Sequence, residues 1–508
     1  MTEEHDQREQ RLARLEALRQ AGRDPYRIER YDRTHQAADV SERFEELEGR
    51  EVRVAGRIPH PPRIMGKASF LDLRDASGRV QVYFRRDDLG DAAYCEAKEL
   101  DYGDIVGVRG VVFRTRTGEP SVHASEIILL AKCLRPIPIG KERGDEHFGG
   151  LHDVEQRYRM RYVDLIANPS SRATLEKRCR LVSALRRFLD SRGFLEVETP
   201  VLQQVAGGAA ARPFKTHHNA LDCDLKLRIS LELPLKRLIV GGFEKVYEIG
   251  RVFRNEGIST RHSPEFTLLE LYQAYTDLDG MMDLVEEMYA DACTAVNGAP
   301  AFTIRRERDG ESIEEYIDLG RRPWRRLSML DGIEQNAGIG REELSCIESA
   351  RAACDRLGVP HERETSLGGI IEKLHELYTQ PTLVQPTFIT DFPIETSPLA
   401  KRHPTNPSLT RRFEVYIACQ ELGNAFSEIN DPIEQRVRFE AQQRQRIAGD
   451  EEAHPMDEDF LRALEYGMPP TGGFGGGIDR LAMVLTGAAS LRDVILFPLM
   501  RPEALTEP

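Results

Sequence analysis

Two stretches that alternate apolar and polar residues, joined by a turn-rich segment, constrain the fold of this chain most. Residues 246–256 and 266–272 each have the alternation of a β-strand. Between them, the segment from Gly257 to Pro264 is rich in Gly, Ser, Thr and Pro, as connecting loops are. The sequence therefore predicts a β-hairpin in the middle of the chain.

The faces of this hairpin carry an unusual mixture of side chains. Because side chains alternate along a strand, Arg254 and Glu256 share one face of the first strand. One face of the second strand carries Phe266, Leu268, Glu270 and Tyr272. A guanidinium, two carboxylates and two aromatic rings on one floor favour a binding surface, although Arg254 or Glu256 alone is equally compatible with a solvated hairpin.

The same residue types suit a nucleotide. A guanidinium grips carboxylate or phosphate oxygens with two parallel hydrogen bonds. A loop that carries Arg261 and His262 can close over a polyphosphate, and Phe266 offers a face to a flat base. This string predicts a site for a phosphorylated ligand.

A glycine-rich stretch more than two hundred residues later predicts a second part of that site. Its sequence is Gly473-Phe474-Gly475-Gly476-Gly477-Ile478-Asp479-Arg480, and residues 481–485 read as a helix. The glycines do not fit the dinucleotide-binding pattern, which opens a helix at its third glycine. They instead predict a strand that leaves room for a flat ligand, with Arg480 placed to reach its phosphates.

Composition limits the class of protein. The 508 residues are 30% charged and have a mean hydropathy of -0.46, which predicts a soluble protein of two or more domains. We expect no membrane span, because no apolar run approaches about 18 residues, and no secretory signal in the polar N-terminus. Eight scattered cysteines without a Cys-x-x-Cys pair argue against zinc and disulfides and favour the cytoplasm.

The N-terminal third predicts a small β-barrel. Residues 8–20 read as an amphipathic helix within an N-terminal helical extension, residues 1–48. Five strand candidates follow in residues 49–148: 52–58, 68–74, 80–84, 105–113 and 122–130. Five short strands suit an OB-fold. This region has 17 Lys and Arg against 15 Asp and Glu, so it permits a nucleic-acid partner although the whole chain carries -14.

The remainder, residues 149–508, reads as one larger domain. It begins with a predicted helix at 172–191 and a strand at 194–197, and a further helix is expected at 281–297. Residues 325–380 form a charge-rich helical segment that we interpret as an insertion, and residues 413–429 return to strand character.

The hairpin and the glycine-rich stretch resemble motifs 2 and 3 of the class II aminoacyl-tRNA synthetases, and the chain resembles the bacterial-type lysyl-tRNA synthetases along nearly its full length. The stretches that carry this closer resemblance are 65–70, 157–165, 206–214, 217–222, 397–401, 423–428 and 492–498. The resemblance implies an α+β protein, in which an OB-fold anticodon-binding barrel precedes a catalytic domain built on an antiparallel sheet flanked by helices. The helix ending at Gly193 and the strand into Pro200 resemble motif 1, which implies a homodimer.

The resemblance also implies the reaction and its residues. ATP and L-lysine would form lysyl-adenylate and pyrophosphate, and tRNA(Lys) would then accept the lysyl group with release of AMP. Arg254 and Arg480 would be catalytic. The ATP-binding residues would be Arg254, Glu256, His262, Phe266 and Arg480, and Mg²⁺ would be held by Glu414 and Glu421. Because these two glutamates are seven residues apart, a turn near 418–420 must intervene if both bind one ion.

Lysine as the substrate is supported by the residues themselves. Burying an ammonium requires carboxylates around it, and Glu270, Tyr272 and Glu428 lie on strand faces of matching parity. The complete set expected for lysine, partly from the resemblance, is Gly208, Glu232, Arg254, Glu270, Tyr272, Asn424, Phe426 and Glu428. Aspartate or asparagine would instead require a cation or amide donors at the far end of the pocket.

Several alternatives and departures remain. A synthetase for aspartate or asparagine, a regulatory paralogue and a protein-lysylating paralogue are the rivals; the intact motifs and the barrel argue against the last two. The chain has Ser230-Leu231 where the family commonly has Ala-Pro, Pro234 where it has Tyr and Ser263 where it has Asn. For the anticodon we expect stacking and base-edge contacts from Arg57, Phe70 and Gln81.

Overall fold

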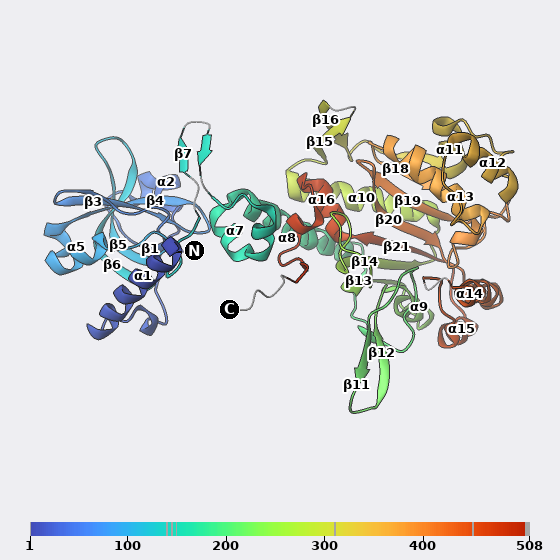
Figure 1. Cartoon of the computed structure of the whole chain (residues 1–508), viewed down its shortest axis with the longest axis horizontal. Helices are drawn as coiled ribbons and strands as arrows, with labels where there is room; N and C mark the ends of the chain where they lie inside the picture. The colour runs from blue at the N-terminus through green and yellow to red at the C-terminus, as the bar shows by residue number, and fades with distance from the viewer. Residues whose placement is uncertain are drawn as a thin grey trace. The chain divides into compact units, whose positions relative to one another are not determined.

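The computed structural model of the chain describes residues 2–138, 141–143, 146–148, 150–308, 311–449 and 452–502. The chain divides into two compact units, Met1–Pro169 and Ser170–Pro508. Figure 1 shows both units, coloured from the N-terminus to the C-terminus.

The first unit combines short helices with the predicted strands. Its elements are α1 (Thr2–Gln20), η1 (Pro25–Arg27), α2 (Asp39–Glu42), α3 (Phe44–Leu47), β1 (Glu51–Arg57), β2 (Arg63–Met65), β3 (Ala68–Arg74), β4 (Arg79–Arg85), α4 (Arg86–Leu89), α5 (Asp91–Lys98), β5 (Ile105–Arg114), β6 (Pro120–Ala131), β7 (Lys141–Arg143), β8 (Glu146–Phe148), α6 (Val154–Arg159) and α7 (Arg161–Ala167).

The five predicted strands close into a barrel. The strand order is β1-β5-β6-β4-β3, and the pairing of Arg57 with Arg74 joins β3 back to β1. Alternate residues such as Val52, Val54, Val80 and Val82 are buried in its core. The predicted OB-fold is therefore confirmed. The short strand β2, which the sequence analysis missed, pairs with β3 and is exposed along its length.

The second unit contains the helices and strands of the larger domain. Its elements are α8 (Pro169–Ser191), β9 (Leu195–Glu196), β10 (Leu202–Gln203), β11 (Lys215–His218), β12 (Cys223–Leu227), α9 (Glu232–Val240), β13 (Lys245–Phe253), β14 (Glu265–Ala274), α10 (Leu278–Asn297), β15 (Ala301–Arg308), β16 (Glu311–Asp318), β17 (Arg325–Ser328), α11 (Met329–Ala337), α12 (Ile347–Leu357), α13 (Leu367–Leu374), η2 (His375–Thr379), η3 (Gln380–Thr382), β18 (Thr387–Thr390), η4 (Ile394–Thr396), β19 (Arg412–Ile417), β20 (Gln420–Ser427), α14 (Pro432–Ile447), α15 (Glu458–Glu465), β21 (Thr471–Gly477), α16 (Ile478–Thr486) and α17 (Leu491–Val494).

An eight-stranded sheet organises this unit. Its order is β17-β18-β19-β20-β21-β14-β13-β9. The five pairings from β18 to β13 are antiparallel, as expected, whereas β17–β18 and β9–β13 at the two edges are parallel. A parallel pair requires a crossover connection, and α11 to α13 supply one between β17 and β18. The sheet is thus antiparallel in its centre and mixed overall.

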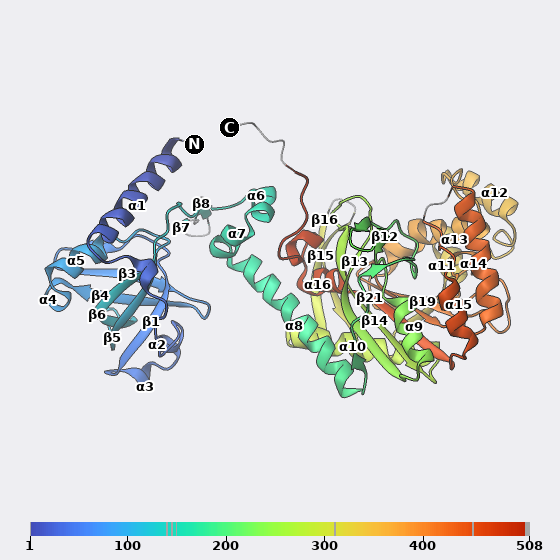
Figure 2. The same ribbon diagram turned by 90° about the horizontal axis from the view of Figure 1, so that it is seen from below.

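Helices cover both faces of the sheet. Leu269, Leu271 and Phe474 face the largest core, to which α8, α10 and α16 contribute. A second cluster joins α9, α14 and α15 to the opposite face through Val246 and Tyr272. Figure 1 shows α9, α14 and α15 on one side of the sheet with α10 and α16 on the other. Figure 2 shows the length of α8, whose Lys177 donates a hydrogen bond to Asn297 of α10.

The segment at residues 325–380 contains three helices with a core of their own. Ile333, Ala350 and Ile370, one from each of α11, α12 and α13, are fully buried in this cluster. The segment also reaches the main sheet, because β17 pairs with β18. Among the described residues, no helix is long and apolar enough to cross a membrane.

Candidate active site

A cavity of about 610 Å³ lies on the sheet face opposite the largest core. Its floor is formed by side chains of β14, β20 and β21. All fourteen residues predicted for ATP, lysine or metal line it: Gly208, Glu232, Arg254, Glu256, His262, Phe266, Glu270, Tyr272, Glu414, Glu421, Asn424, Phe426, Glu428 and Arg480. The structure therefore brings together residues from across 273 positions of sequence.

The hairpin β13–β14 supplies the part of the floor that the sequence predicted. Val252 pairs with Phe266 and Phe253 with Glu265, so Phe266, Leu268, Glu270 and Tyr272 all face the cavity. The expected extension of the first strand to Glu256 is wrong, because β13 ends at Phe253. Beyond it the Glu256 N–H donates to the Arg254 carbonyl, which turns the chain out of the ladder.

Arg254 is held above the floor by a cation–π contact. Its guanidinium carbon lies 5.0 Å from the centre of the Phe266 ring, and its Nε donates to the Ile229 carbonyl at 3.3 Å. Burial lowers the pKa of Arg254, and the negative charges of Glu256 and Glu270 oppose that shift. Arg254 remains a cation in a cavity lined with carboxylates, so it is available to an anionic group of a ligand.

Glu414 and Glu421 face the same side of the sheet because of the predicted turn. Ala418 and Cys419 have φ values of 55° and 59°, which form the tight connection between β19 and β20. The register also shifts between Val415 and Tyr416. Together the turn and the shift place both glutamates at the cavity, as the odd spacing required.

The electrostatics of these two glutamates fit a bound cation. Burial and the neighbouring charge of Glu421 raise the pKa of Glu414 to about 7. Arg412 donates to Glu414 at 2.6 Å, and Arg480 donates to Glu421 at 3.1 Å. Among the described residues, no group of three or more His, Cys, Asp or Glu gathers as a metal site. Two carboxylates that repel each other suit Mg²⁺ when phosphate oxygens complete its shell.

The far end of the cavity holds three buried carboxylates and one buried ammonium. Glu232, Glu270 and Glu428 are each at most 5% exposed. Lys236 Nζ lies 2.5 Å from Glu232 Oε1 and also forms an ion pair with Glu428. Burial raises the pKa of Glu428 to about 8. This end therefore carries three carboxyl groups against one ammonium, and a cationic ligand would favour their ionised form.

One oxygen at this end has no partner. Glu428 Oε1 is buried and makes no hydrogen bond to any residue that the structure describes. A buried acceptor without a donor is costly, so Glu428 is suited to a donor that arrives with a ligand.

The glycines of β21 let side chains of the pocket approach the strand closely. A Cβ on Gly473 would come within 2.1 Å of Glu428 Oε1 and 2.4 Å of the Tyr272 ring. A Cβ on Gly475 would make an ordinary van der Waals contact with Glu270 Cγ at 3.5 Å. The room at Gly473 is used by Tyr272 and Glu428, and room for a flat ligand along the rest of the strand stays a prediction.

The departures around Glu232 leave the helix intact. Helix α9 begins at Glu232 and includes Pro234 in its first turn, where a missing N–H is tolerated. Ser230 Oγ accepts from the Glu232 N–H at 3.0 Å and donates to Glu270 Oε1 at 3.0 Å. Ser263 also lines the cavity.

The sequence analysis missed several residues of this site: Lys236, Arg412, Tyr416 and His454. Lys236 could have been found, because it lies four residues after Glu232 and therefore on the same helix face. Arg412 likewise shares strand parity with Glu414. His454 gave no such local signal.

The predicted anticodon residues lie on three strands of the barrel. Phe70 on β3 is opposite Tyr83 of β4, and Gln81 is opposite Asp72, two residues along from Phe70. Phe70 is half-buried, whereas its neighbours along the strand are buried, so its side chain faces away from the barrel core. Phe70 is therefore not a residue of that core. Arg57 ends β1 on the third strand, where it pairs with Arg74.

Phe70 belongs to a strip of half-exposed rings. The ring of Tyr83 lies 5.1 Å from Phe70, 5.6 Å from Phe113 and 5.1 Å from His123. Such rings on neighbouring strands form a surface on which unpaired bases can stack.

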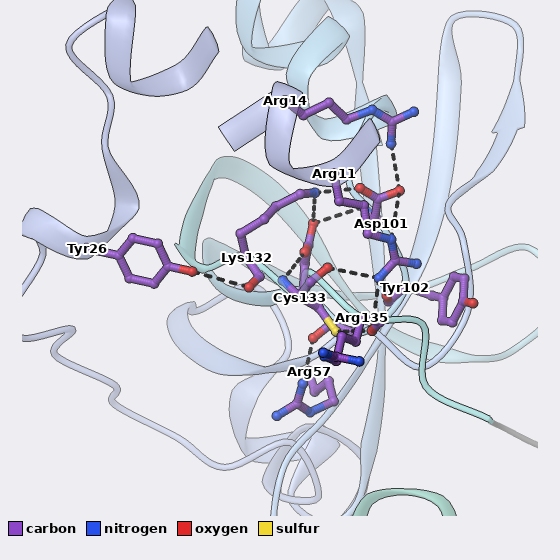
Figure 3. Close-up of polar contacts among 11 residues, drawn as sticks. Arg11, Arg14, Tyr26, Arg57, Asp101, Tyr102, Lys132, Cys133 and Arg135 are labelled. Atoms are coloured by element: carbon purple, nitrogen blue, oxygen red, sulfur yellow. Dashed lines mark hydrogen bonds and ion pairs between the residues drawn. The ribbon is translucent and has the colours of Figure 1, made fainter. Parts of the chain in front are cut away.

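A polar network ties α1 to the end of the barrel that carries Arg57 (Figure 3). Arg11 donates to the Tyr102, Cys133 and Arg135 carbonyls. Arg57 donates to the Gly103 carbonyl at 2.7 Å in the neighbouring turn. The N-terminal helix therefore fixes the segment against which Arg57 rests.

Comparisons with known proteins agree with this geometry. Residues 153–501 match the family described as "tRNA synthetases class II (D, K and N)", and residues 52–130 match the OB-fold nucleic acid binding domain. The chain is 55% identical to a lysine–tRNA ligase of Moorella thermoacetica over 98% of this chain and 99% of the relative. This chain belongs to the class II lysyl-tRNA synthetases. A lysine–tRNA ligase of Carboxydothermus hydrogenoformans is 53% identical to this synthetase over 97% of both chains.

Proposed function

We propose that this synthetase ligates L-lysine to tRNA(Lys) through a lysyl-adenylate, with ATP as the second substrate. The observation that carries the choice of amino acid is the charge at the far end of the cavity. Glu232, Glu270 and Glu428 outnumber Lys236 by two groups. A lysine molecule brings two ammonium groups, and its carboxylate can meet Arg254. The charges of substrate and cavity therefore balance.

Aspartate and asparagine fit this charge less well. A second carboxylate would enter the end of the cavity where Glu270 and Glu428 are buried, and like charges there repel. The nearby cations are already paired: Lys236 with Glu232 and Glu428, and Arg412 with Glu414 and Glu372. The comparison supports lysine over the two alternatives that share this family profile.

Adenylation requires alignment more than proton transfer, because the lysine carboxylate is already ionised. Arg254 would hold that carboxylate next to the α-phosphate, and Phe266 would stack on the adenine with Glu256 beside it. His262 and Arg480 would meet the outer phosphates. Such fixed donors stabilise the charge that develops on phosphate in the transition state.

Glu414 and Glu421 would hold Mg²⁺, which would neutralise phosphate charge when bound. The carboxylate pair supports this assignment, because its mutual repulsion is relieved by a cation. The role of this chain's own residues is positional: Arg412 and the Tyr416 hydroxyl fix the Glu414 carboxylate at 2.6 and 2.7 Å.

The barrel would bind the anticodon of tRNA(Lys). Phe70 and the adjoining rings offer stacking, and Gln81 and Arg57 offer donors at base edges. We also propose a homodimer formed through α8 and β9, near which Leu195, Val201 and Leu202 are exposed. A cytoplasmic location is consistent with eight free cysteines in the described residues.

One experiment tests the substrate and the first half-reaction together. ATP–pyrophosphate exchange is measured with each of the twenty amino acids in turn. We expect exchange with L-lysine and at most weak exchange with aspartate or asparagine. Exchange that depends on aspartate or asparagine, with none for lysine, would overturn the proposal.

A further inference from the structure

His454 is a buried histidine at the edge of the cavity, and the mechanism proposed above assigns it no role. It is 2% exposed, and its ring stacks on Phe439 at 4.7 Å with an interplanar angle of 10°. Its Nε2 atom accepts a hydrogen bond from the Gly208 N–H at 2.7 Å. The two residues are 246 positions apart in the sequence.

The hydrogen bonds of the ring fix its protonation state. Because Nε2 accepts from Gly208, it carries no proton, and a neutral imidazole then has its proton on Nδ1. Nδ1 lies 2.8 Å from the Pro455 carbonyl, to which it donates. Burial lowers the pKa of His454 to about 4, and the positive charges of Lys236 and Arg446 act in the same direction against Asp457. The ring is therefore neutral near pH 7.

The loop that carries Gly208 packs closely against the His454 ring. A Cβ on Gly207 would meet His454 Cε1 at 2.8 Å, and Gly208 has a φ of 89° that L side chains rarely adopt. A Cβ on Gly208 would also meet the Ser230 hydroxyl at 2.6 Å. The backbone here approaches its neighbours too closely for any side chain, so its position depends on the groups it contacts.

We propose that His454 is a positioning residue that orients Gly208 toward the α-ammonium of the amino-acid substrate. Gly208 has no side chain, and its N–H is used by His454, so its carbonyl is the polar group left for an ammonium. Lys236, which pairs with Glu232 at the same end of the cavity, lies close enough to His454 to lower its pKa. This inference rests on the lysine-binding function proposed above.

The matched variants His454→Gln and His454→Asn test it. A Gln carbonyl oxygen can occupy the place of Nε2 and accept from Gly208, whereas the shorter Asn reaches only the place of Nδ1. Both variants lose the ring that stacks on Phe439, so a space-filling role predicts equal effects.

We expect His454→Asn to raise the KM for lysine about tenfold in pyrophosphate exchange, as loss of one buried hydrogen bond does. The KM for ATP should change less than about twofold, and His454→Gln should recover most of the lysine KM. Equal losses in both variants, or parallel increases in both KM values, would overturn the inference.

Crystal structures of the two variants provide a readout that needs no activity. Gly208 should keep its position in His454→Gln and shift in His454→Asn, and an unmoved Gly208 in His454→Asn would contradict the positioning role. Absence of lysine-dependent exchange in the wild-type enzyme would instead count against the proposed function, while the crystal structures still decide whether His454 holds Gly208.

Discussion

The Ser230 hydroxyl lies 3.0 Å from Glu270 Oε1 and donates a hydrogen bond to it. The Leu231 N–H donates to the same oxygen at 2.9 Å, and the Tyr272 hydroxyl donates to Glu270 Oε2 at 3.1 Å. The Ala-Pro pair common in the family would supply neither of the first two donors, since alanine has no hydroxyl and proline no N–H. The Ser230-Leu231 pair just before Glu232 thus gives Glu270 two hydrogen-bond donors that the Ala-Pro pair lacks.

Ser230→Ala should weaken lysine binding without changing ATP binding. Burial and the charge of Glu232 raise the pKa of Glu270 to about 7, and the Ser230 hydrogen bond opposes that increase. Loss of this hydrogen bond should weaken lysine binding by about 1 kcal/mol, which raises the KM for lysine roughly fivefold. Pyrophosphate exchange at varied lysine and ATP measures both constants. An unchanged lysine KM would show that Glu270 does not depend on Ser230.

Glu428→Gln should sharply reduce the use of lysine. The substitution removes a buried carboxyl group whose Oε1 lacks a partner in the described residues. The ammonium of bound lysine would favour its ionised form, so the variant loses a charge-assisted hydrogen bond. We expect the KM for lysine to rise on the order of 100-fold, with little change for ATP. Glu458→Gln on the exposed side of α15 is the control. Lysine-dependent exchange equal to that control would remove the main residue-level argument for lysine.

Arg254→Ala should abolish most adenylation. Loss of a guanidinium contact to the charge that develops in the transition state costs about 3 kcal/mol, or roughly two orders of magnitude in rate. Exposed Arg251 on the same hairpin serves as the matched control, Arg251→Ala. Circular dichroism verifies the fold of both variants. Near-normal exchange by a folded Arg254→Ala enzyme would mean that the assigned role is wrong.

Phe70→Ala should separate the two half-reactions. The ring is on the outer face of the barrel and contacts Tyr83, so its loss should weaken binding of tRNA by about 1–3 kcal/mol per stacked base. Charging of tRNA(Lys) should fall, whereas tRNA-independent pyrophosphate exchange should stay at the wild-type level. A similar loss in both assays would indicate damage to the fold rather than to RNA binding.

His375→Phe should flatten the loss of stability in acid. Burial lowers the pKa of His375 to about 4, and neither ring nitrogen has a hydrogen-bond partner among the described residues. Between the unfolded value near 6.5 and about 4, the unfolded chain binds more protons, so stability falls as pH falls. From pH 7.5 to pH 5 this amounts to about 2 kcal/mol. Urea unfolding at both pH values measures it, and an identical pH dependence in the variant would exclude His375 as the source.

Local sequence patterns predicted much of the fold, and they predicted which side chains of the strands face the cavity. The five barrel strands and the β13–β14 hairpin follow from alternation and turn residues, which act between near neighbours. The turn at Ala418 and Cys419 could be inferred as well, because Glu414 and Glu421 cannot share a face of one uninterrupted strand. The roles of the individual site residues remain predictions.

The amino-acid sequence by itself therefore determined the motifs, the two types of domain and fourteen of the residues that line the cavity. Tertiary structure alone decided that Lys236 lies between Glu232 and Glu428, that His454 holds Gly208, and that both edge strands of the sheet are parallel. The physical reason is the distance along the sequence over which each kind of interaction acts. Periodicity reports which side chains share a face of one element, whereas contacts between distant segments depend on strand order and crossover connections, which leave no periodic trace in the sequence.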